Sequence, residues 1–129
     1  MLHCTPQTVE RVVSGSFPEL LTSLNKHIRE LRGDVPETMQ AFSGLARAAL
    51  EPKALDVKTK ELMAIAIGIA VRCDGCIGFH VKAALAAGAT REEIAETIGL
   101  AIYMGAGPSM IYGAETLRAL NELAPAPKA

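Results

Sequence analysis

Helical periodicity, broken at intervals by capping and turn residues, is the feature that most limits how this sequence can fold. The clearest stripe is a set of apolar residues spaced along one helical face: Leu20, Leu21, Leu24, Ile28 and Leu31. Strand signals are scarce, because no stretch sustains an apolar–polar alternation and no Asn-Gly or Asp-Gly hairpin turn occurs. The pattern predicts an all-α fold, a compact multi-helix domain of about six to seven helices.

Start and stop signals give the extents of these helices. We expect Asp34 and Asp56 to be N-caps, and Thr90 to form a capping box with Glu93. The run 62–71 is apolar on every side, which predicts a helix buried all round. The expected helices cover about residues 6–13, 17–31, 36–50, 57–72, 76–87, 91–104 and 108–123, the last two separated by a break at 105–107.

The chain is more apolar than a domain of its size easily buries. It has 129 residues, which suits a single domain over 1–129, and 50% of them are hydrophobic while 21% are charged. Since a small domain leaves much of its surface in water, we expect a homo-oligomer whose subunits cover each other's apolar surface. The uncharged run 62–71 is far shorter than the roughly 20 residues that span a bilayer, which argues against a membrane protein.

Charge and cysteine content narrow the class of protein further. The formal net charge is -1 and aromatic residues make up 4%, so nothing indicates a nucleic-acid partner. The first residues lack the basic and apolar regions of a signal peptide. Three cysteines are too few for a disulfide scaffold, whereas a close pair in a reducing compartment indicates redox chemistry or metal binding. These features predict a cytoplasmic protein.

The segment 73–80 carries the residues best suited to chemistry. Cys73 and Cys76 can close a disulfide across the first turn of a helix, where free N–H groups and the helix dipole stabilise a thiolate. His80 follows Cys76 by four residues and faces the same way on a helix, so its imidazole can exchange a proton with a thiol. The segment therefore predicts a thiol-redox site.

Glu61 is the candidate fourth member of this site. It is the last charged residue before the apolar run, so we expect it to be partly buried, and a buried carboxylate needs a partner. In an ideal helical hairpin that turns at 72–73, His80 would face a residue near Ile65, about one turn from Glu61. The spacing thus permits a contact between Glu61 and His80 without requiring it.

Taken together, residues 36–117 resemble the alkylhydroperoxidase D and carboxymuconolactone decarboxylase family. The resemblance rests on Glu61, which lies twelve residues before Cys73, on the C-x-x-C pair followed by His80, and on the stretch Gly-Ala-Thr-Arg-Glu-Glu-Ile at 88–94. It implies an all-helical fold, trimers or hexamers, and peroxide reduction through the two cysteines without metal or other cofactor. One departure is Gly75, which stands where the better-studied peroxidases carry a histidine.

The expected activity is that of a thiol peroxidase or disulfide reductase, with Cys73, Cys76, His80 and Glu61 as catalytic residues. One thiolate would attack a hydroperoxide to give a sulfenic acid, and the second cysteine would resolve it to a disulfide. A thiol or dithiol electron donor would then reduce that disulfide. Either cysteine could make the first attack.

Other interpretations stay open at the level of sequence. The cysteines could be ordinary core residues. They could also bind zinc, although a structural site has about four ligands and only His3, Cys4 and His27 remain to supply them. A decarboxylase acting on a small lactone acid would need only His80 and Glu61 for proton transfer, and lactone decarboxylases usually lack the cysteine pair. A non-catalytic redox-sensing oligomer would change its assembly on oxidation.

Overall fold

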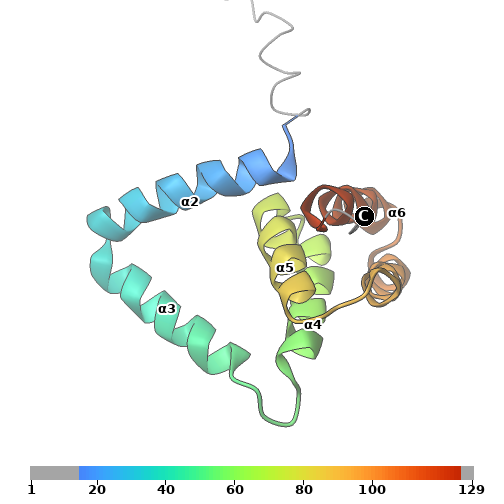
Figure 1. The fold of residues 1–129 in the computed structure, drawn as a ribbon, viewed down its shortest axis with the longest axis horizontal. Helices are drawn as coiled ribbons and strands as arrows, with labels where there is room; N and C mark the ends of the chain where they lie inside the picture. Colours follow the sequence, from blue (N-terminus) through green and yellow to red (C-terminus); the bar gives the residue numbers. More distant parts are fainter. Residues whose placement is uncertain (1–14, 126–129) are drawn as a thin grey trace, which may run out of the picture.

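The protein folds into helices alone over residues 15–125, the part that the computed structural model describes (Figure 1). These helices are α2 (Phe17–Asp34), α3 (Pro36–Leu50), α4 (Val57–Ala70), α5 (Asp74–Ala86) and α6 (Arg91–Leu123). The predicted all-α class is confirmed, with five helices within these residues in place of six or seven along the chain. The helix expected at 6–13 lies outside the described residues.

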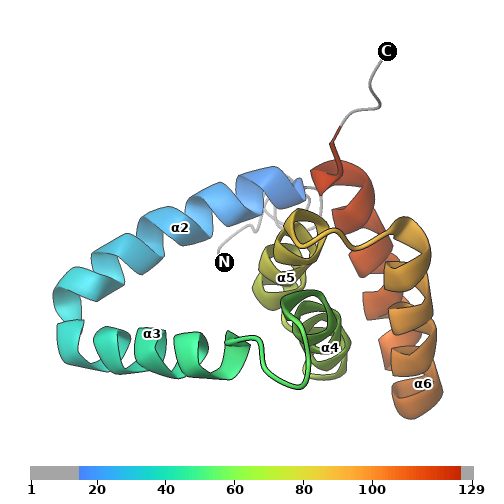
Figure 2. The ribbon, with the colours of Figure 1, turned by 60° about the horizontal axis from the view of Figure 1, so that its bottom comes forward.

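The core lies where α4, α5 and α6 pack against one another (Figure 2). Its fully buried side chains come from all three helices and from the start of α2: Phe17, Ile65, Ile69, Ile77, Val81, Ala84, Ile94, Ala119 and Leu120. Helix α2 crosses the end of this group, and α3 folds back to complete an open V with α2 (Figures 1 and 2). Burial of the apolar faces of α4, α5 and α6 therefore holds the core together.

Helix α2 approaches α5 closely because α5 carries glycine where the two helices meet. A methyl group at Gly78 would lie 2.8 Å from Leu21 Cδ2 and 3.0 Å from Phe17 Cδ1, closer than carbon atoms pack. Helix α6 also contacts the start of α2, because the Arg118 guanidinium lies 4.5 Å from the centre of the Phe17 ring and Glu122 accepts the Phe17 N–H at 3.0 Å. The start of α2 is thus fixed against both α5 and α6.

The boundary between α2 and α3 differs from the prediction. Asp34 was expected to cap α3, but it is the last residue of α2, and Val35 separates the two helices. The Val35 N–H still bonds the Leu31 carbonyl, so Gly33 does not end the helix. The end comes instead from Pro36, which disfavours helical backbone at the residue before it and needs no hydrogen-bond acceptor for its own nitrogen.

Two other capping predictions are confirmed. Asp56 accepts the Thr59 N–H at 2.7 Å and begins α4, and Thr90 and Glu93 exchange hydrogen bonds of 2.9 and 3.1 Å in a capping box at the start of α6. The break expected at 105–107 is a kink at Ala106, whose φ of 53° and ψ of -135° interrupt α6. Residues 91–104 and 108–123 therefore form two helical halves of one element.

Helix α6 is relevant to the prediction that the chain does not cross a membrane. By length and composition it is apolar enough to cross one, and its uncharged run 97–114 is longer than the run 62–71 considered above. The argument against a membrane protein from residues 62–71 therefore does not cover α6. It is kinked at Ala106 and packs against α4 and α5, and 17% of its most apolar 18-residue window is buried in one chain. The absence of a membrane partner and the cytoplasmic location remain predictions.

Helix α4 is not buried all round, contrary to the prediction. One face is buried through Glu61, Ile65, Gly68 and Ile69, whereas Ile67 is 59% exposed and Val71 is 63% exposed. Helix α3 buries none of its residues and packs mainly against α2. Apolar surface also remains on α6, where Tyr103 is 82% exposed. The prediction for α4 failed because an apolar run indicates only that its side chains favour being covered. It does not show whether the covering residues belong to the same chain.

Candidate functional site

The site is built around the corner between α4 and α5. Helix α4 ends in a Schellman turn, in which the Arg72 N–H bonds Ile69 O at 3.2 Å and the Cys73 N–H bonds Gly68 O at 3.0 Å. Arg72 takes the left-handed position of this turn with φ of 59°, a place usually held by glycine. The turn directs the chain back along α4, so α5 begins at Asp74, two residues before the expected start at Cys76.

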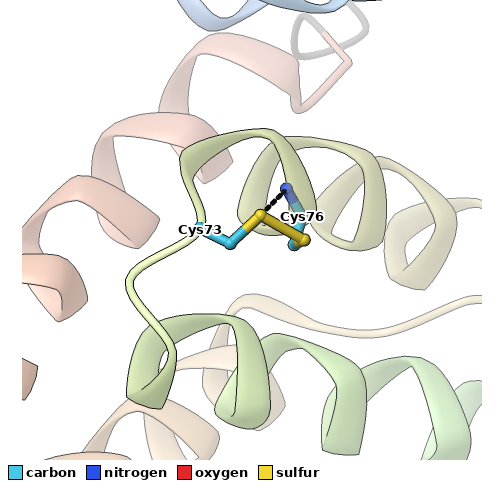
Figure 3. Close-up of a disulfide and its surroundings, with 2 residues drawn as sticks. All are labelled: Cys73 and Cys76. Carbon is cyan, nitrogen blue, oxygen red and sulfur yellow. Dashed lines mark hydrogen bonds between the residues drawn. A yellow bond between two sulfur atoms is a disulfide. The ribbon is translucent and has the colours of Figure 1, made fainter. Parts of the chain in front are cut away.

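Cys73 and Cys76 are joined in a disulfide across the first turn of α5, with their Cα atoms 5.2 Å apart (Figure 3). Cys73 is the N-cap residue of α5, and its Sγ accepts the Cys76 N–H at 3.2 Å, the dashed line in Figure 3. Cys76 faces α4, since a methyl group at Gly68 would lie 3.5 Å from Cys76 Cβ. The two sulfur atoms are therefore adjacent but lie in different settings.

His80 and Glu61 are in direct contact. The Nδ1 atom of His80 lies 2.6 Å from Oε2 of Glu61, and their side chains are 33% and 6% exposed. Glu61 is more deeply buried than expected, because it lies on the buried face of α4 with Ile65 and Gly68. The non-helical residues 71–73 and the length of both side chains close the one-turn gap that an ideal hairpin would leave. The structure therefore contains the contact between Glu61 and His80 that the sequence only permitted.

This geometry assigns the two ring nitrogens of His80 different functions. When Glu61 is ionised and the His80 ring is neutral, Nδ1 donates its proton to Oε2 of Glu61 and Nε2 can accept a hydrogen bond. His80 lies one helical turn beyond Cys76 on α5 and is partly open to solvent. The pair can therefore move a proton between solvent and the neighbourhood of the cysteines. Within residues 15–125 no group of three or more His, Cys, Asp and Glu side chains could hold a metal ion.

Gly75, the residue immediately before the second cysteine, is confined by α2. A methyl group at Gly75 would lie 2.8 Å from Leu24 Cδ1, so the start of α5 has no room for a larger residue here unless Leu24 moves. A histidine at position 75 would meet the same obstacle. Sequence reasoning noted Gly75 but missed Leu24, which looked like one more member of an apolar stripe. It also missed the capping function of Cys73, because helix N-caps are usually Ser, Thr, Asp or Asn.

The sequence and fold of this chain are similar to those of several known proteins. The sequence model of the carboxymuconolactone decarboxylase family matches residues 36–119. A carboxymuconolactone decarboxylase family protein of Legionella pneumophila, solved in its apo form, is 46% identical and superposes with a TM-score of 0.83, over 84% of this chain and 97% of that chain. A Thermotoga maritima member, for which involvement in an antioxidative response has been suggested, is 33% identical with a TM-score of 0.70, over 78% of this chain and 89% of that chain. An uncharacterized protein of Cupriavidus necator is 37% identical over 80% of this chain and 91% of its own length.

Proposed function

The chain belongs to the carboxymuconolactone decarboxylase family, and on that premise we propose that it is a thiol-dependent peroxidase or disulfide reductase. The observation that carries the proposal is the Cys73–Cys76 disulfide at the start of the helix that also bears His80. The buried contact between His80 and Glu61 supports it, because that pair can relay protons. The suggested antioxidative function of the Thermotoga maritima relative points to the same class of chemistry.

The reaction would run through both redox states of the cysteine pair. In the reduced protein one thiolate attacks a hydroperoxide, which becomes an alcohol while the sulfur becomes a sulfenic acid. The second cysteine displaces water from that sulfur and closes the disulfide. Two thiols of an electron donor, or one dithiol, then reduce the disulfide by exchange. His80, oriented by Glu61, supplies and removes the protons, and the chemistry uses no metal or other cofactor.

A stopped assay with cumene hydroperoxide tests the proposal. The fully reduced protein is mixed with the peroxide, and free thiols and remaining peroxide are counted together. We expect two thiols to be lost per chain for each peroxide consumed, and no turnover in Cys76→Ser, which cannot form the disulfide. Cys4→Ser is the matched control, because it removes the cysteine outside the pair and should leave turnover unchanged. Intact thiols and untouched peroxide would contradict the proposal.

The contact between His80 and Glu61 also favours a second candidate, a decarboxylase acting on a small lactone acid. A buried carboxylate that orients a histidine is sufficient for proton transfer to carbon without any thiol. Replacement of both cysteines separates the two candidates. The double variant Cys73→Ser/Cys76→Ser would keep a decarboxylase activity and lose a thiol peroxidase activity. A peroxide-inert protein whose oligomer size changes on oxidation would instead be a redox sensor.

We further propose that the chain works as a homo-oligomer, a trimer or a hexamer. The support is the apolar surface that one chain leaves uncovered, above all on α3, where Phe42 is 62% and Leu45 is 64% exposed. A lone helix of this length is only marginally stable in water without a packed face. Light scattering after size exclusion should give a multiple of the 13.6 kDa chain, and Phe42→Glu should lower that mass. A monomeric wild-type protein would contradict this proposal.

A further inference from the structure

A leucine of α2 lies directly on the ring that the disulfide closes. This ring spans residues 73–76 and includes Gly75 (Figure 3). A methyl group at Gly75 would lie 2.8 Å from Leu24 Cδ1, and within residues 15–125 no other side chain from outside the ring comes within 4 Å of that position. The absence of a side chain at Gly75 is therefore what allows Leu24 to approach the ring that holds the two sulfur atoms.

The neighbouring helices leave both cysteines half-buried. Cys76 faces α4, where a methyl group at Gly68 would lie 3.5 Å from its Cβ. Leu24 approaches from α2, which is held against α5 one turn earlier, where Leu21 packs on Gly78. Leu24 is itself half-buried, residues 25–27 after it are exposed, and α2 then runs away from α5 towards α3 (Figures 1 and 2). Helix α4 and Leu24 thus both restrict the approach to the ring.

Thiol–disulfide exchange depends on such access. A thiolate has to reach a sulfur atom of the disulfide, so the rate depends on the surroundings of that sulfur as well as on the pKa values of the thiols. A side chain that lies on the ring hinders a bulky thiol more strongly than a small one. Since Leu24 is apolar, its replacement by another apolar residue leaves the charges around the cysteines unchanged. The effect of size can therefore be measured separately from the effect of charge.

We propose that Leu24 limits the size of the thiol that can reduce the Cys73–Cys76 disulfide, which makes it a specificity-determining residue for the electron donor. This inference deepens the proposed function and rests on it for the donor step. In that step a donor thiolate attacks one sulfur, the S–S bond breaks, and a mixed disulfide and one cysteine thiolate form. A second donor thiolate attacks the donor sulfur of the mixed disulfide and releases the other cysteine. The two donor sulfurs are then joined, and the protein has gained two electrons and the two protons that the donor thiols lost.

Reduction by two thiols of different size tests the proposal without any peroxide. The oxidised protein is mixed at pH 7 with an excess of β-mercaptoethanol or of glutathione, samples are quenched with acid and alkylated, and reduced pairs are counted by mass spectrometry. The measured quantity is the rate with glutathione divided by the rate with β-mercaptoethanol. Because Leu24→Ala shortens the side chain on the ring, we expect this ratio to rise about fivefold. An unchanged or lower ratio would overturn the proposal.

Two control variants separate access from a general loss of packing. Leu24→Met keeps the volume of the side chain, and Leu20→Ala makes the same truncation on α2 at a residue that packs against the core, so both should keep the wild-type ratio. If Leu24→Ala only loosened the start of α5, both thiols would react faster at a constant ratio, which would also overturn the proposal. Should circular dichroism show that Leu24→Ala is unfolded, Leu24→Val takes its place, with a smaller rise expected.

The proposal and the proposed function can fail separately. If the protein leaves cumene hydroperoxide untouched, the proposed function fails, and the ratio of the two reduction rates still decides whether Leu24 limits access to the disulfide. If peroxide is consumed and the ratio is the same in Leu24→Ala and the wild type, the proposed function stands and the inference about Leu24 is wrong.

Discussion

The contact between His80 and Glu61 gives a prediction about stability that does not depend on the proposed reaction. The Glu61 side chain is 6% exposed, and its Oε2 lies 2.6 Å from His80 Nδ1. Removing the partner of a buried charge costs up to about 3–5 kcal/mol, because the charge stays buried without a partner. The His80 side chain is 33% exposed, so water can enter the space that its ring leaves. We therefore expect His80→Ala to lower the free energy of unfolding by about 2–3 kcal/mol.

His27→Ala is the matched control. His27 also places Nδ1 on a hydrogen-bond acceptor, the Ser23 carbonyl oxygen at 2.8 Å, but it does so on the exposed surface of α2. No buried charge is left when its ring is removed, so the loss should stay within about 0.5 kcal/mol. Urea denaturation at pH 7, followed by circular dichroism at one protein concentration, compares both variants with the wild type.

A double variant tests the cause of the loss. Glu61→Leu in the His80→Ala background removes the buried carboxylate and keeps most of the apolar volume, so the double variant should be at least about 1 kcal/mol more stable than His80→Ala alone. A loss below about 0.5 kcal/mol for His80→Ala would refute the reasoning, because the carboxylate would then not need its histidine. The reasoning would also be refuted if the loss in the double variant equalled the sum of the losses in His80→Ala and in Glu61→Leu alone.

Three further predictions follow from packing, backbone and charge. Gly78→Ala should destabilise the protein by about 1–3 kcal/mol in urea denaturation, because a methyl group there meets α2 at 2.8 Å, whereas Gly68→Ala meets only ordinary contacts at 3.5 Å and should be neutral or slightly stabilising. Ala106→Gly should raise the melting temperature, because φ of 53° and ψ of -135° strain any residue with a Cβ, at a cost of about 1 kcal/mol or more. The pKa of Glu93 should lie below its usual range in a carbon-13 titration, chiefly because its carboxylate accepts the N-cap N–H of α6 and then because of Lys58. Stability from this carboxylate is therefore present above its unfolded pKa and lost as pH falls through the lower folded value, and Lys58→Ala should move the folded pKa upward.

Local signals explain which parts of the fold were predictable from sequence. The stripe of α2 and the caps at Asp56 and Thr90 depend on residues a few positions apart, and the structure confirms them. Asp34 failed as a cap because a second local signal, Pro36, acts more strongly on the same turn. The burial of α4 could not be predicted, since an apolar run does not show whether its partner belongs to the same chain.

The site itself depends on a feature with no clear signature in the sequence, the left-handed turn at Arg72. Only three residues, 71–73, connect α4 to α5, and the turn brings Cys73 to the N-cap position. If α5 had begun at Cys76, as the sequence suggested, the Cys73 sulfur would lie outside the reach of the first N–H groups of that helix. The contact between Glu61 and His80 depends on the same corner, because the corner sets how α5 lies against α4. One unusual backbone conformation thus positions both the cysteine pair and the contact between Glu61 and His80, and the proposed chemistry depends on that turn.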